Sequence, residues 1–229
     1  MSAARKAISM LVRRPALAVA ALLLLSACAG KPPPNWQLDA RHAIDAAVVA
    51  WLEGNARVEA AETARARSGI ARTGRTDLLA RAELMRCAAR VASLVFEPCA
   101  AFEALRADAA PAELAYADFL AGRLRPQDIA LLPEPQRGVA AATTDEAAAT
   151  ALAAIDDPLS RLIAAGVLLQ SGRDSPAVLQ SAVDTASSKG WRRPLLAWLN
   201  VQLLRAERAG ATAEAERLRR RIAVVQVAP

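Results

Sequence analysis

Helix-breaking residues recur along positions 36–229 and divide this part of the chain into segments rich in Ala, Leu, Arg and Glu. These four residues are strong helix formers. Aromatic residues, which favour strands, make up only 3% of the chain. Because glycine is favoured just after a helix, the sequence predicts an all-α fold of short antiparallel helices, with ends at Gly54, Gly74, Gly122, Gly172, Gly190 and Gly210.

Several helix starts can be read from local patterns. Thr143 and Glu146 have the spacing of a capping box, in which each side chain bonds to the backbone at the other's position. Asp157 and Ser175 each precede a proline, which fits the first turn of a helix. We therefore expect helices to begin at these three places.

A proline-rich stretch, 124–138, interrupts the helical pattern. We interpret it as a connector between an N-terminal helical half, 36–123, and a C-terminal helical half, 139–229. Within the second half, residues 198–222 resemble a tetratricopeptide-type hairpin, with Ala215 where a small residue lets two helices approach. A more general α-solenoid or an irregular helical bundle also fits the pattern.

The first residues have the layout of a secretory signal peptide. Arg5, Lys6, Arg13 and Arg14 precede an apolar run at 16–25, and no acidic residue occurs before Cys28. A transmembrane helix is the first alternative, but the apolar stretch 16–29 is shorter than the roughly 20 residues that a span needs. A signal peptide that is cleaved without lipidation is the second alternative.

The motif Leu25-Ser26-Ala27-Cys28 resembles the lipobox of bacterial lipoprotein precursors. The resemblance implies removal of the signal peptide 1–27, covalent lipid on Cys28, and attachment to the membrane by two or three acyl chains. Ala29, in a position where Asp favours retention in the inner membrane, implies the outer membrane, facing the periplasm. Residues 28–35, with three prolines at 32–34, then form a stiff tether.

The charge balance argues against nucleic acid as a partner. The formal net charge is +6, but four of the 29 basic residues precede Cys28, which leaves 25 basic against 23 acidic residues in the mature chain. The predicted mature protein therefore has no strong excess of positive charge.

Two cysteines remain besides Cys28. Because the periplasm oxidises thiols, Cys87 and Cys99 are predicted to form a disulfide across a turn; two buried reduced thiols are the alternative. A metal site is not expected, since these cysteines and the sole histidine, His42, supply too few ligands. No cofactor is predicted apart from the covalent lipid.

Possible partner-binding residues lie near the C-terminus. Trp191 and Trp198 are seven residues apart and so share a helix face. Tryptophans placed in this way usually pack in the core, and the alternative is that one of them lines a groove and binds a partner. Arg217 and Arg220 belong to a basic cluster that either stabilises a helix end or contacts an acidic partner or anionic lipid.

The sequence contains no catalytic motif that we recognise. We therefore expect a non-catalytic, outer-membrane-anchored adaptor for a protein partner in envelope assembly or maintenance, similar in plan to tetratricopeptide lipoproteins. The alternatives are an envelope hydrolase that uses a pair of carboxylates, and a purely structural lipoprotein.

Overall fold

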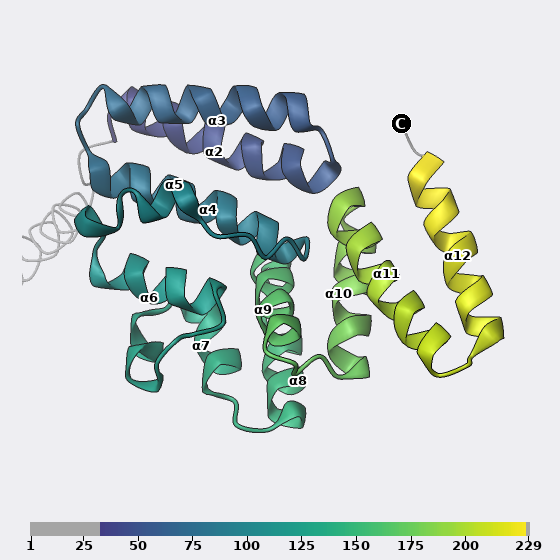
Figure 1. Ribbon diagram of the computed structural model, residues 1–229. Helices are drawn as coiled ribbons and strands as arrows, with labels where there is room; N and C mark the ends of the chain where they lie inside the picture. The colour runs from purple at the N-terminus through teal and green to yellow at the C-terminus, as the bar shows by residue number, and fades with distance from the viewer. Residues whose placement is uncertain (1–32, 228–229) are drawn as a thin grey trace, which may run out of the picture. The chain divides into compact units, whose positions relative to one another are not determined.

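The computed structural model describes residues 33–227, which are helical with no strand among them (Figure 1). The predicted all-α class is therefore confirmed. The elements are α2 (Asn35–Glu53), α3 (Ala56–Ala71), α4 (Thr76–Ala92), α5 (Ala100–Glu103), α6 (Pro111–Leu120), α7 (Glu134–Ala141), α8 (Asp145–Ala153), α9 (Pro158–Gln170), α10 (Pro176–Ser188), α11 (Arg192–Arg208) and α12 (Thr212–Val227), with 3₁₀ turns η1 (Arg106–Asp108) and η2 (Pro126–Leu131).

Side-chain caps begin four of the described helices, α3, α8, α9 and α10. The Asp157 side chain accepts a hydrogen bond from the Ser160 amide at 2.7 Å, and Ser175 caps α10 in the same way. The third predicted start is wrong by one residue, because Thr144, not Thr143, accepts a bond from the Ala147 amide and caps α8.

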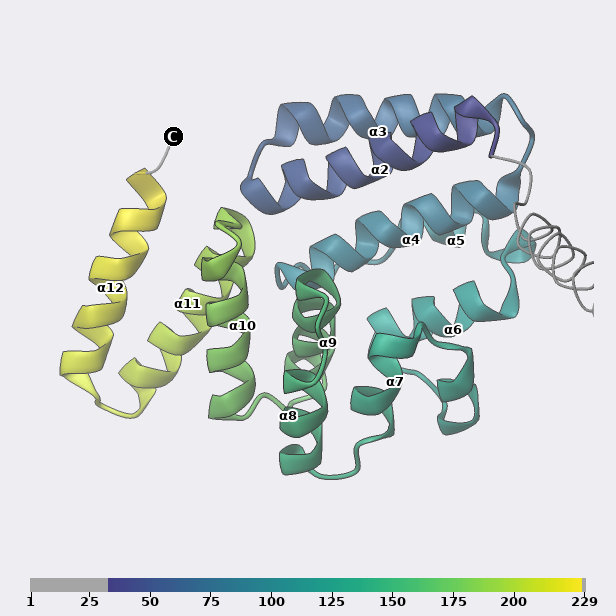
Figure 2. The same ribbon diagram turned by 180° about the vertical axis from the view of Figure 1, so that it is seen from behind.

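Helix α4 lies at the centre of the packing. It contacts α3, α5, α6 and α9 (Figure 2). Its crossing with α9 is close, because a Cβ atom added at Gly166 would lie less than 3.0 Å from the backbone oxygen of Val91. A glycine at this position therefore allows the two backbones to approach.

One hydrophobic cluster runs from Ala80 to Ile222 and includes residues on both sides of the proline-rich stretch. That stretch folds into η2 and the start of α7, and both elements contact each other. The two predicted halves therefore share one core.

The N-terminal and C-terminal helices pack as neighbours along the chain. A small cluster of Ala40, Ile70 and Ala82 joins α2, α3 and α4. At the other end, α10 contacts α11, and α11 contacts α12. Consecutive antiparallel hairpins of this kind fit a helical bundle or solenoid.

Candidate partner-binding pocket

A pocket of about 570 Å³ opens between α4, the loop that follows it, and α6. Its apolar lining comes from both helices and includes Leu84, Val91 and Leu120. Arginine and glutamate side chains from α4, α5 and the loops line the rest. Known ligand sites are concave and combine apolar side chains with a smaller number of polar groups, and this pocket has both kinds of lining.

A sharp turn after α4 directs the chain back over the pocket. Leu94 has φ 60°, in the left-handed region that leucine rarely adopts, and its amide donates to the Val91 oxygen. The next amide, of Val95, donates to the Arg90 oxygen at 2.9 Å, which completes a Schellman-type helix end. The turn places Phe96 and Pro98 in the pocket wall.

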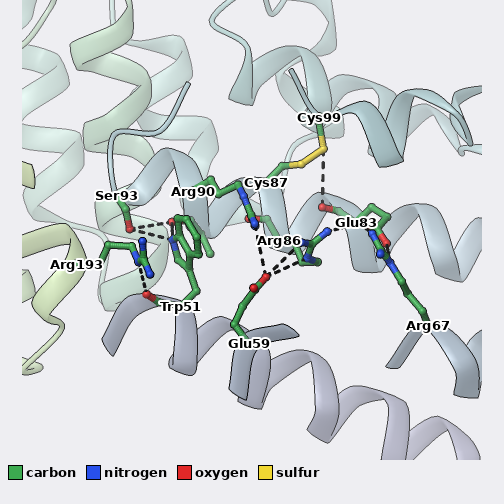
Figure 3. A network of polar contacts seen from close by, with 11 residues as sticks. Trp51, Glu59, Arg67, Glu83, Arg86, Cys87, Arg90, Ser93, Cys99 and Arg193 are labelled. Atoms are coloured by element: carbon green, nitrogen blue, oxygen red, sulfur yellow. Dashed lines mark hydrogen bonds and ion pairs between the residues drawn. A yellow bond between two sulfur atoms is a disulfide. The ribbon is translucent and has the colours of Figure 1, made fainter. Parts of the chain in front are cut away.

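Cys87 and Cys99 hold this wall against α4. Their sulfur atoms lie at disulfide distance, and their Cα atoms are 5.9 Å apart, as bridged cysteines require (Figure 3). The Cys99 sulfur also lies 3.8 Å from the backbone oxygen of Glu83. The geometry is that of the predicted disulfide, and the bridge limits how far the wall can move from the helix.

Glu83, which lines the pocket, is held between two arginines. Its side chain is 3% exposed, and it accepts hydrogen bonds from Arg67 at 2.5 and 2.8 Å and from Arg86 at 2.9 Å. Burial is the largest influence on this group and opposes ionisation, but the hydrogen bonds from Arg67 and Arg86 outweigh it, so the pKa of Glu83 is lowered. Glu83 is therefore a structural anion.

Arg86 and Arg90 share a second carboxylate. Glu59, on α3, accepts from the Arg86 Nη2 at 3.2 Å and lies 3.6 Å from the Arg90 Nη2. Burial, followed by repulsion from Arg86, lowers the pKa of Arg90 below its usual value. Arg90 is therefore a partly buried cation that shares Glu59 with Arg86 and is also attracted by Glu97.

Two tryptophans attach distant helices to the end of α4. The Trp51 ring lies between the guanidinium groups of Arg90 and Arg193, at 4.3 and 3.8 Å, and its Nε1 donates to the Ala89 oxygen at 3.1 Å (Figure 3). The Trp198 Nε1 donates to the Ala92 oxygen, also at 3.1 Å. The carbonyl groups that a helix end leaves unpaired thus receive donors from α2 and α11.

The four C-terminal residues predicted to bind a partner do not come together in one pocket. Trp198 is fully buried, so its placement does not support contact with a partner. Trp191 is half-buried and lines a separate pocket of about 300 Å³ with Val49 and Lys189.

The two predicted arginines lie on α12 and line neither of these pockets. Arg217 donates two hydrogen bonds to Glu214, at 2.6 and 2.7 Å, so a helix-surface ion pair accounts for it. Arg220 is exposed. Cys28, the predicted lipidation site, lies outside the described residues.

Sequence reasoning did not identify the charged residues of the pocket. Glu83 and Arg86 are three apart on one helix face, which is a visible signal, but the same spacing occurs on many solvated helix faces. Glu59 comes from another helix, so its contact with Arg86 and Arg90 depends on how α3 and α4 pack. The predicted disulfide was the one local pattern that pointed to this wall.

Comparison with known proteins finds no relative: no protein-family model, curated protein or solved structure matches the chain. Between residues 33 and 227, no helix is both long and apolar enough to cross a membrane. The same residues contain no group of three His, Cys, Asp or Glu side chains placed to hold a metal ion.

Proposed function

We propose that the protein is a lipid-anchored adaptor of the bacterial cell envelope, non-catalytic and attached through Cys28 to the outer membrane on its periplasmic side. The proline-rich tether gives the helical domain reach, and the pocket beside the Cys87–Cys99 bridge receives a protein partner. The lipobox-like motif supports the anchor, and a cysteine pair at disulfide distance fits an oxidising compartment.

One observation carries the binding part of the proposal: the pocket combines an apolar floor with carboxylates already committed to arginines. Glu83 accepts from Arg67 and Arg86, and Glu103 accepts from Arg106 at 2.6 and 3.1 Å. The hydrogen bonds from Arg106 lower the pKa of Glu103, as the arginines do for Glu83. Such groups suit recognition through fixed charges.

The same carboxylates bear on the alternative of an envelope hydrolase. A general acid needs a raised pKa so that it holds a proton at neutral pH. Glu83 and Glu103 shift in the opposite direction, so they are poor candidates for the proton donor. The alternative of a purely structural lipoprotein predicts a surface without a pocket, and the pocket between α4 and α6 favours the adaptor.

The anchor is tested by intact mass and membrane fractionation of the wild type and Cys28→Ala in a Gram-negative host. We expect the wild type to carry two or three acyl chains and to sediment with outer membrane, and the variant to do neither. A wild-type protein that is soluble, cleaved and unmodified would show that the lipobox interpretation is wrong.

The pocket is tested in the same cells by photocrosslinking. Benzoylphenylalanine replaces Phe96, which lines the pocket and is 39% exposed, or Leu38, which lies on α2 and is 40% exposed. We expect a discrete crosslinked product from position 96 and none from position 38. Equal crosslinking at both positions, or none at either, would contradict partner binding at the pocket.

A further inference from the structure

The positive charge of the described chain is concentrated in its last two helices. Residues 192–227, which form α11, α12 and the turn between them, contain eight arginines and three glutamates, a net charge of +5. Residues 33–191 contain 16 basic and 20 acidic side chains, a net charge of −4. The last hairpin is therefore strongly basic, although residues 33–227 together are nearly neutral.

Ion pairs neutralise only part of the charge of this hairpin. Three of its arginines have carboxylate partners: Arg205 with Asp174, Arg217 with Glu214, and Arg219 with Glu207. The guanidinium groups of Arg208, Arg220 and Arg221 have no ion-pair or hydrogen-bond partner between residues 33 and 227. Glu216, also unpaired, is four residues from Arg220 and offsets one of these charges. Two of the three positive charges are therefore left without a counter-charge.

One side of α12 packs on α11, and the opposite side is exposed (Figure 1). The packed side carries Ala215, Leu218 and Ile222, which are the buried residues of this helix. Val224 and Val227, on the exposed side, are 75% and 84% exposed, the highest values for large apolar residues between positions 33 and 227. The terminal units of helical solenoids present polar outer faces. The two valines depart from that pattern.

Basic and apolar residues lie on the same side of α12. Arg220 is four residues before Val224 and seven before Val227, so the three side chains project from one helix face. Arg221 is half-buried and lies at the border of this face. Arginines beside apolar side chains on an exposed helix are typical of helices that lie in the interface of an anionic membrane.

We infer that this face of α12 lies on the surface of an anionic phospholipid bilayer. Arg220 and Arg221 pair with headgroup phosphates, and Val224 and Val227 enter the boundary between headgroups and acyl chains. Two arginines and two valines bind a membrane weakly by themselves, but an anchor on Cys28 makes the contact intramolecular and so raises its occupancy. The inference therefore rests on the proposed function, and it adds a second contact that fixes the orientation of the helical domain.

A bilayer fits this surface better than an acidic protein does. Neither pocket described above is lined by residues of α12. A protein partner needs a shaped surface that excludes water around its main contacts. A bilayer, by contrast, offers phosphates and an apolar boundary to any exposed helix with suitable side chains.

The test places a fluorescent label beside the valines and measures its contact with lipid. Dansylalanine replaces Ala223, which is exposed on α12, or Ala64, which is exposed on α3. The full-length protein, purified in detergent, is reconstituted into vesicles of phosphatidylcholine alone or mixed with phosphatidylglycerol. A spin-labelled lipid quenches any label that touches the bilayer. With phosphatidylglycerol, we expect quenching about threefold greater at position 223 than at position 64, and a smaller difference as salt is raised.

Matched double variants determine whether the arginines of α12 cause the contact. The double variant Arg220→Gln, Arg221→Gln should remove the additional quenching at position 223. The double variant Arg57→Gln, Arg72→Gln lowers the net charge equally, at two exposed arginines near the ends of α3 that are unpaired in the described chain. It should leave the quenching unchanged.

Several outcomes would overturn the inference. They are equal quenching at positions 223 and 64, equal quenching in both kinds of vesicle, and the same loss in both double variants. Absence of quenching together with Arg220-dependent binding of a labelled polyglutamate peptide would assign the face to an acidic protein instead.

Flotation with phosphatidylcholine vesicles tests the anchor separately. A protein that floats with these vesicles but is not quenched at position 223 keeps the anchor, and the inference is wrong. A protein that is quenched by phosphatidylglycerol vesicles but does not float with phosphatidylcholine keeps the α12 contact, and the proposed anchor is wrong.

Discussion

Replacing Gly166 with alanine tests the close approach of α4 and α9. The added Cβ would lie less than 3.0 Å from the backbone oxygen of Val91 and 3.0 Å from its Cγ1 atom. A side chain could rotate away, but a backbone oxygen cannot, so the two helices would have to separate. Val91 is 6% exposed and belongs to the main core cluster, so the separation would disturb packing on both sides.

Two opposing effects set the change in the free energy of unfolding that we expect for Gly166→Ala. Alanine is favoured over glycine within a helix by about 1 kcal/mol. Overpacking of a core costs about 1–3 kcal/mol, and we take the upper value because the obstructing atom is backbone. The net loss in the free energy of unfolding is then about 2 kcal/mol, which corresponds to a fall in Tm of roughly 4–8 °C for a domain of this size.

A second glycine provides the control. Gly69, within α3, has Ala40 Cβ as the nearest atom to an added Cβ, at an ordinary contact distance of 3.8 Å. Gly69→Ala should therefore gain up to about 1 kcal/mol. Urea unfolding followed by far-ultraviolet circular dichroism measures both variants. If Gly166→Ala is as stable as the wild type, or if both variants are destabilised alike, the close α4–α9 crossing is refuted.

Three further predictions concern the pocket and the end of α4. Reduction of the Cys87–Cys99 bridge should lower the free energy of unfolding by about 3 kcal/mol, which urea unfolding would show as a lower midpoint. The variant with alanine at both positions should not respond to reductant. A wild-type midpoint that does not change on reduction would argue against the bridge. The pKa of Glu83 is lowered in the folded state, so the stability it contributes is present above its ordinary value of 4.5 and is lost as pH falls through the folded pKa. Glu83→Gln should therefore lower the free energy of unfolding by about 2 kcal/mol at neutral pH. The variant should also lose less stability than the wild type as pH falls below 4.5. Equal losses of stability in the two proteins over that pH range would contradict this. Trp198→Phe removes the donor to the Ala92 oxygen at a fully buried site and should cost about 3 kcal/mol in the same urea assay, whereas a change under about 0.5 kcal/mol would show that the bond is unimportant.

The helix starts that the sequence predicted correctly depend on neighbours a few residues away. Asp157 and Ser175 cap their helices through amides three residues later, so the pattern alone contains the contact. The start near Thr143 was misplaced because Thr144 follows it directly, and either hydroxyl has a suitable amide nearby.

The pocket was predictable only in part. Cys87 and Cys99 are close in sequence, and a turn between them brings them within bonding reach. By contrast, Glu59 meets Arg90 through the packing of α3 on α4, which residue spacing does not encode. The spacing of Trp191 and Trp198 predicted a shared face but could not tell whether that face meets solvent or core, and Trp198 is fully buried.

The tryptophan bonds at the end of α4 affect the order in which the chain can fold. Ala92 and the Trp198 donor are 106 positions apart, and Trp51 and Arg193 are 142 apart. A chain that leaves the ribosome from its N-terminus therefore exposes the oxygens of Ala92 and Trp51 long before their donors, Trp198 and Arg193, have been synthesised. A premature stop ahead of residue 198 would leave the Ala92 oxygen without its donor. The early helices therefore need nearly the whole chain to complete their packing, whereas a repeat in many repeat arrays contacts only its neighbours.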